Sequence, residues 1–120
     1  MNYFKYSIIY AVIRPEISER LSVGLIIVDG DNVDVLYSRE KLKALKLLFS
    51  EKECKFISRV VSSMKKDQTV NSTEAINYLT RYSNNLIAVS PLHQIDVAPT
   101  KLNKDRLYKN YVYSGSKKVA

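Results

Sequence analysis

The chain has 120 residues and a formal net charge of +7, with 46% apolar and 26% charged residues. This length fits one domain, and the composition argues against disorder because it supplies enough apolar surface for a core. A single cysteine excludes an internal disulfide, and with a single histidine it leaves too few ligands for a structural zinc site. We therefore expect a folded domain with no cofactor and no metal.

The sequence shows no targeting segment. Its first residues lack the basic start and long apolar run of a signal peptide, and no apolar stretch approaches the ~18 residues that span a bilayer. We therefore expect a cytoplasmic protein. The positive charge gathers at the C-terminal end, where residues 101–120 carry six Lys or Arg against a single acid, Asp105.

The first strand is expected at residues 3–13. Aromatic and β-branched residues occupy both the odd and the even positions of this stretch, so both faces of the strand are apolar, which is typical of a central strand. Pro15 ends it, because proline lacks the backbone donor of a sheet ladder. Residues 15–21 are expected to form a loop.

An antiparallel hairpin follows. Apolar runs at 21–28 and 33–37 flank the turn residues 29–32, whose sequence is Asp-Gly-Asp-Asn. Glycine and asparagine tolerate positive φ, so this stretch predicts a tight connection between two strands. Gly24 lies inside the first of these strands and indicates either a bulge or a close approach of another group.

Beyond Ser38 the apolar spacing becomes helical. Ser38 is a plausible N-cap, and the apolar positions of this first helix are Leu42, Leu45, Leu48 and Phe49. Ser50 and Glu53 have the spacing of a capping box, so a second helix is expected to start there. A third helix is expected over 71–82.

The last third of the chain is less regular. A short strand is expected at 86–90 and an extended edge segment at 92–97, separated by Pro91, whereas 101–113 fits neither the strand nor the helical period cleanly. Residues 114–120 are expected to be a frayed basic end.

The predicted order of elements is three strands, three helices and a strand. It favours a single α+β domain over residues 1–113. We expect a mostly antiparallel sheet, comprising the N-terminal strand, the hairpin and the later strand, covered by about three helices on one face.

The N-terminal third carries a family resemblance. Residues 6–14, Tyr-Ser-Ile-Ile-Tyr-Ala-Val-Ile-Arg, precede the acidic Glu19 and the Val-Gly strand at 23–27. This combination resembles the bacterial family catalogued as domain of unknown function 3037, although the family often has Asn where this chain has Ser22. The similarity covers 6–37. It implies no established activity, but an accessory role with a HipA-like kinase as partner.

Charged residues crowd the first loop. Arg14, Glu19 and Arg20 lie between two core strands, and loops held by rigid strands often carry function. These three are therefore candidate binding residues. The competing interpretation is a solvated loop with weak surface ion pairs.

The C-terminal segment interleaves cations with tyrosines. Its candidate binding residues are Lys101, Lys104, Arg106, Tyr108 and Lys109. Cations contact phosphates and tyrosine rings stack on bases, so this segment is a candidate single-strand interface. The competing interpretation has the tyrosines dock the segment onto the domain while the lysines face solvent.

Catalytic patterns are sparse. His93 could serve a metal-free hydrolase or nuclease with Ser90 or Cys54, but the sequence holds no nucleophile elbow and no phosphate-binding loop. We expect no catalytic residue and no metal ligand.

The leading hypothesis is a small non-enzymatic accessory or protein-interaction domain. The first alternative is a nucleic-acid-binding module that uses the basic, tyrosine-rich C-terminal segment. The second is the hydrolase or nuclease built around His93.

Overall fold

The computed structural model describes residues 2–66 and 86–113. Two short 3-10 turns, η1 and η2, connect larger elements. In chain order the elements are β1 (Phe4–Arg14), η1 (Pro15–Ile17), β2 (Glu19–Asp29), β3 (Asn32–Tyr37), α1 (Arg39–Ala44), η2 (Leu45–Leu47), α2 (Glu51–Lys66), β4 (Ile87–Val89), β5 (His93–Ile95) and α4 (Lys101–Tyr111). The helix expected at 71–82 and the frayed end expected at 114–120 lie outside the described residues.

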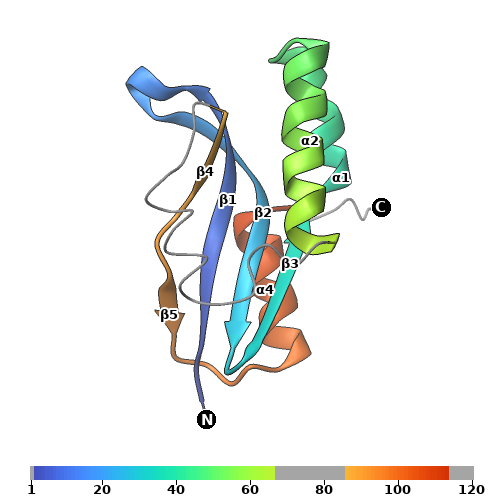
Figure 1. Cartoon of the computed structure of the whole chain (residues 1–120). Helices are drawn as coiled ribbons and strands as arrows, with labels where there is room; N and C mark the ends of the chain where they lie inside the picture. The colour runs from blue at the N-terminus through green and yellow to red at the C-terminus, as the bar shows by residue number, and fades with distance from the viewer. Residues whose placement is uncertain (1, 67–85, 114–120) are drawn as a thin grey trace, which may run out of the picture.

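The strands form one sheet in the order β3-β2-β1-β4, with β5 also paired to β1 (Figure 1). All of these pairings are antiparallel. The predicted central position of β1 is confirmed, because β1 pairs with β2 as well as with β4 and β5. The predicted hairpin of β2 and β3 is also confirmed, because Asp29 pairs with Asn32 across the tight turn. The predicted α+β fold with a mostly antiparallel sheet is therefore confirmed.

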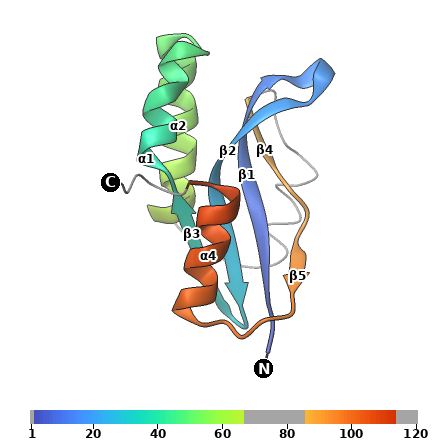
Figure 2. The same ribbon diagram turned by 180° about the vertical axis from the view of Figure 1, so that it is seen from behind.

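The helices cover both faces of the sheet. One core cluster joins side chains such as Ile9 of β1 to Ile57 of α2, and a second joins Ile8 of β1 to Leu107 of α4. Figures 1 and 2, seen from opposite sides, show α4 and α2 on opposite faces. The expectation that all helices share one face is corrected: β1 is apolar on both parities, and each apolar face needs cover.

A β-bulge interrupts the pairing of β1 with β2. Ile9 pairs with Gly24 while Tyr10 pairs with Ser22, so Val23 is an extra residue in β2. The bulged residue is fully buried, and its carbonyl oxygen accepts the backbone N–H of Ser38 at 2.9 Å. The bulge therefore links the middle of β2 to the start of α1.

Gly24 is required by close packing inside the protein. A Cβ built there would lie 2.9 Å from the carbonyl oxygen of Leu36 and 3.0 Å from Cδ1 of Ile9. The close approach predicted from the lone strand glycine is made by the protein's own atoms.

The helix starts predicted at Ser38 and Ser50 are confirmed. The Ser38 hydroxyl accepts the N–H of Lys41 at 3.1 Å. Ser50 and Glu53 form the reciprocal capping box, with bonds of 3.2 and 3.0 Å. The cap of α4 was missed in the sequence: the hydroxyl of Thr100 accepts the N–H of Asn103 at 3.2 Å, and residues 101–111 are helical.

Two local expectations are wrong. The loop expected at 15–21 is only η1 and Ser18, because β2 already pairs with β1 from Glu19 onward. Leu48 was expected to face the core but is 53% exposed. The chain tightens into η2 after α1, and this change of helical pitch alters which side chains face the sheet.

Replacing Gly24 by alanine is expected to lower the free energy of unfolding by about 1–3 kcal/mol, because the new methyl group overpacks a buried site. Chemical denaturation measures the change. Gly30→Asn is the control, since nothing lies within 4 Å of a Cβ at that position and asparagine tolerates positive φ. A Gly24→Ala variant as stable as the unaltered protein would contradict the packing described here.

Candidate functional site

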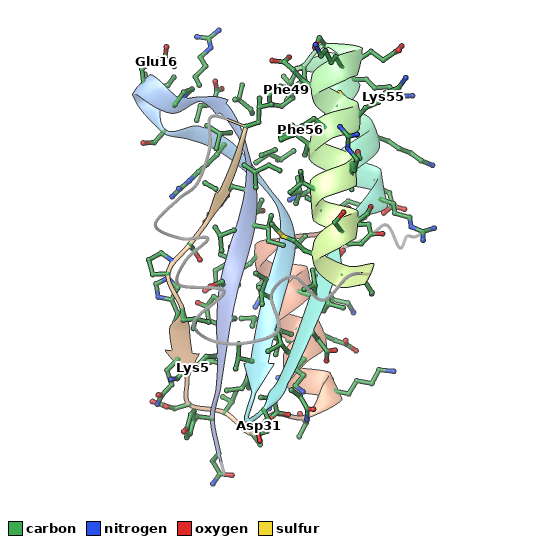
Figure 3. All side chains as sticks on the ribbon, viewed as in Figure 1. Lys5, Glu16, Asp31, Phe49, Lys55 and Phe56 are labelled. Atoms are coloured by element: carbon green, nitrogen blue, oxygen red, sulfur yellow. The ribbon has the colours of Figure 1, made fainter. Side chains whose placement is uncertain are left out.

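A groove of about 860 Å³ lies between α1 and α2. On the α1 side its lining residues are Arg39, Leu42, Lys43 and Lys46. On the α2 side they are Glu51, Cys54, Lys55, Ser58 and Ser62, and Tyr37 and Phe49 complete the wall. We call this feature the cationic groove. Figure 3 shows Lys55 on the side of α2 away from the sheet, opposite Phe56.

The floor of the cationic groove is apolar. Leu42 and Cys54 are 8% and 9% exposed and also belong to the core cluster beneath α1 and α2. The aromatic ring of Phe49 packs against the same cluster, and the Cys54 thiol points to the carbonyl oxygen of Phe49 at 3.9 Å. This floor offers an apolar surface that continues directly into the protein interior.

The rim of the cationic groove is positively charged. Four cationic side chains line it, and Glu51 is its single lining carboxylate. Glu51 contacts Lys55 at 3.3 Å, but both side chains are largely exposed, at 85% and 75%. Such an exposed pair stabilises a helix by only about 0.3–0.5 kcal/mol, so Lys55 remains available to an incoming carboxylate.

The candidate residues of the first loop take separate positions. Arg14 and Glu19 meet across the start of the β1–β2 pairing at 3.6 Å, with exposed side chains. The guanidinium of Arg20 lies instead over the ring of Tyr10, 4.1 Å from its centroid. These are a weak surface ion pair and a cation–π contact.

The C-terminal candidates serve partly to fasten α4. Lys104 forms an ion pair with Asp29 of the β2–β3 turn at 3.0 Å, and both side chains are mostly buried. Tyr108 packs against the core cluster under α4, where burial raises the pKa of its hydroxyl. Lys101, Arg106 and Lys109 lie exposed on the helix.

An aromatic cluster lies on the face of the sheet that α4 covers. The rings of Tyr6 and Tyr111 stack with centroids 5.6 Å apart, and the ring of His93 lies 5.5 Å from that of Tyr6. Burial, and then the hydrogen bond with Tyr111, raise the pKa of Tyr6. The stacking fixes α4 to β1 and places His93 at the edge of the cluster.

The structure places His93 away from Cys54, one of the two suggested nucleophiles. Cys54 belongs to the core cluster under α2, whereas His93 lies beside Tyr6, which packs against the cluster under α4. The Ser90 hydroxyl accepts the N–H of Ile8 at 2.8 Å and donates to the carbonyl oxygen of Pro91 at 3.2 Å. Ser90 thereby bonds the end of β4 to β1.

A lysine–serine contact that the sequence did not indicate connects three elements. The Lys41 ammonium donates to the carbonyl oxygen of Ser22 at 2.7 Å and to its hydroxyl at 3.2 Å. The Ser22 hydroxyl donates to the carbonyl oxygen of Tyr111 at 2.5 Å, near the end of α4. Partial burial lowers the pKa of Lys41. Only the folded chain reveals this contact, since Lys41 has no distinguishing sequence neighbours.

Across residues 2–66 and 86–113, no three His, Cys, Asp or Glu side chains are grouped so that they could hold a metal ion. No helix within these ranges is long and apolar enough to cross a membrane. Comparison with known family models, curated proteins and solved structures finds no match to this chain. The resemblance of residues 6–37 to the family named above stays a prediction.

The contact between Lys41 and Ser22 predicts energetic coupling. Ser22→Ala is expected to lower the free energy of unfolding by about 1 kcal/mol, because the Tyr111 carbonyl loses its donor. Lys41→Met and the double variant complete a mutant cycle, and chemical denaturation should give a coupling free energy of at least about 0.5 kcal/mol. Strictly additive losses would show that the two side chains do not act together.

Tyr6 predicts sensitivity to alkali. The pKa of Tyr6 in the folded protein is raised above the ordinary 10.0, which is also its value in the unfolded chain. The stability contributed by the neutral Tyr6 hydroxyl is therefore complete below pH 10.0 and is lost as the pH rises through the folded pKa. The free energy of unfolding should therefore fall as the pH rises above about 10, and Tyr6→Phe should reduce the fall. Tyr3→Phe, which removes a hydroxyl at an exposed position, is the matched control, and a fall for Tyr6→Phe as large as that for Tyr3→Phe would contradict the expectation.

Proposed function

We propose that this chain is a non-enzymatic, cytoplasmic protein-interaction domain that binds an acidic segment of a partner protein in the cationic groove. The observation that carries the proposal is the combination of an apolar floor with a rim of four cations and one carboxylate. Apolar contacts supply affinity and complementary charge supplies specificity and fast association.

Exposed apolar residues beside the groove support this proposal. Leu47 and Leu48 are 87% and 53% exposed and lie in the chain between the lining residues Lys46 and Phe49. Two neighbouring exposed leucines in the segment that joins lining residues of the groove add apolar surface that a partner could bury.

The nucleic-acid alternative has less support. Ring stacking on bases needs free ring faces, and Tyr6 and Tyr111 stack on each other. Lys104 is paired with Asp29. The hydrolase alternative needs a nucleophile beside His93, but Cys54 belongs to the core cluster under α2 and the Ser90 hydroxyl is bonded to the backbone of Ile8 and Pro91.

The resemblance of residues 6–37 suggests a first partner to try. It implies an accessory role beside a HipA-like kinase, so such a kinase is the first candidate for binding experiments. The cationic groove is independent of this choice, because it is defined by charge and apolar surface rather than by the family.

Charge reversal in the groove tests the proposal. The double variant Lys43→Glu/Lys46→Glu should weaken capture of a partner from nuclease-treated cell extract at least about tenfold, because it replaces attraction by repulsion. Quantitative mass spectrometry measures the capture.

The matched control is Lys101→Glu/Lys109→Glu, which makes the same charge change on α4, away from the groove. Circular dichroism checks that both variants fold. If the two variants lose partners equally, the partner recognises overall charge and the groove is not its binding site. If material is captured only from extract that has not been treated with nuclease, the chain binds nucleic acid instead.

A further inference from the structure

The cationic groove is built from two helices at matching spacing. Its lining residues on α2 recur at intervals of three and four, from Glu51 to Ser62, and those on α1 and η2 recur in the same way from Arg39 to Lys46. Such spacing places all of them on one face of each helix. Two helix faces with a depression between them form the kind of surface into which a third helix packs, ridges into grooves.

The size of the groove fits a short helical segment. At a rise of 1.5 Å per residue, the lining stretch of α2 is roughly 16 Å long and that of α1 and η2 roughly 10 Å. These lengths correspond to about two to three turns of a docked helix.

The chemistry of the wall disfavours an extended peptide. A peptide strand binds mainly through backbone hydrogen bonds to a free sheet edge. Here the walls are helices, whose backbone groups bond to each other within each helix. A partner in this groove must bind through its side chains, as an amphipathic helix does.

The charges flank the apolar floor on both sides. Lys43 and Lys46 come from the α1 side and Lys55 comes from α2, with Leu42 and Phe49 at the floor and wall. A helix that places apolar residues on the floor would carry carboxylates along both edges of its apolar stripe. Because the contact of Lys55 with Glu51 is exposed and weak, a partner carboxylate can replace Glu51.

We propose that the segment bound in the cationic groove is an amphipathic helix with acidic residues on both sides of its apolar stripe. This inference rests on the proposed function and specifies the structure and charge pattern of the bound segment. The apolar residues of that helix recur at i, i+3 or i+4, and i+7, and its carboxylates contact Lys43 and Lys46 on one side and Lys55 on the other.

Peptide selection tests this. A displayed library of random peptides of about 16 residues, long enough for four turns of helix, is selected on the full chain and, in parallel, on Lys43→Glu/Lys46→Glu. Peptides enriched only on the unaltered chain should carry Asp or Glu beside apolar residues at helical spacing. A synthetic copy of the most enriched peptide should gain helical circular dichroism on binding.

Two changes to that peptide sharpen the result. A central proline should weaken binding about a hundredfold or more, because it breaks a helix. A second peptide carries lysine in place of a glutamate on the edge that faces α1. This peptide should bind the unaltered chain more weakly than the original peptide does, and it should bind Lys46→Glu more tightly than it binds the unaltered chain.

The outcomes separate the two proposals. If groove-dependent peptides alternate apolar and acidic residues and tolerate the central proline, the helical occupant is wrong while the proposed function stands. If the selected peptides bind Lys43→Glu/Lys46→Glu as tightly as the unaltered chain, the groove is not the site and both proposals fail. Displacement of the peptide by single-stranded oligothymidylate at equal concentration, but not by polyglutamate, would assign the groove to nucleic acid and overturn both.

Discussion

The extra residue Val23 in β2 sets how this protein buries both faces of its sheet. Before the bulge, odd residues such as Leu21 face α2, and after it even residues such as Ile26 do. The bulged carbonyl accepts the N–H of Ser38, the residue that caps α1. The start of α1 is therefore bonded to β2 at the bulge, and the cationic groove depends on the position of α1 because this helix forms one of its walls.

Burial of β1 on both faces also accounts for the C-terminal helix. Leu107 of α4 and Val112, which follows the helix, cover the second face, and the helix is held by the ion pair of Lys104 with Asp29 and by the bond from Ser22 to Tyr111. Part of the basic, tyrosine-rich character that made this segment a candidate interface is thus structural. Within the described residues, the cations around the cationic groove have no such structural role. The groove is therefore a better candidate for a binding site than the C-terminal segment.

The sequence predicted features that depend on near neighbours and missed those that depend on tertiary contacts. The hairpin turn at 29–32 and the caps at Ser38 and Ser50 follow from residues within four positions of each other, and all three are confirmed. The two-sided burial of β1 was visible as apolar residues on both parities, but only packing tells that two helix layers are needed. No role was predicted for the groove lysines, because no short-range signal distinguishes Lys43 or Lys55 from the solvated face of a helix.

The arrangement of like charges around the cationic groove has a physical cost that supports a role in binding. Cations that share one depression repel each other, and this repulsion is only partly screened at physiological salt, where the Debye length is about 8 Å. Local choices that oppose stability are expected mainly where function requires them. Exposed Leu47 and Leu48 beside the same groove are a second such choice, since they leave apolar surface in water. An acidic amphipathic partner bound in the groove would relieve the repulsion by placing carboxylates among the cations.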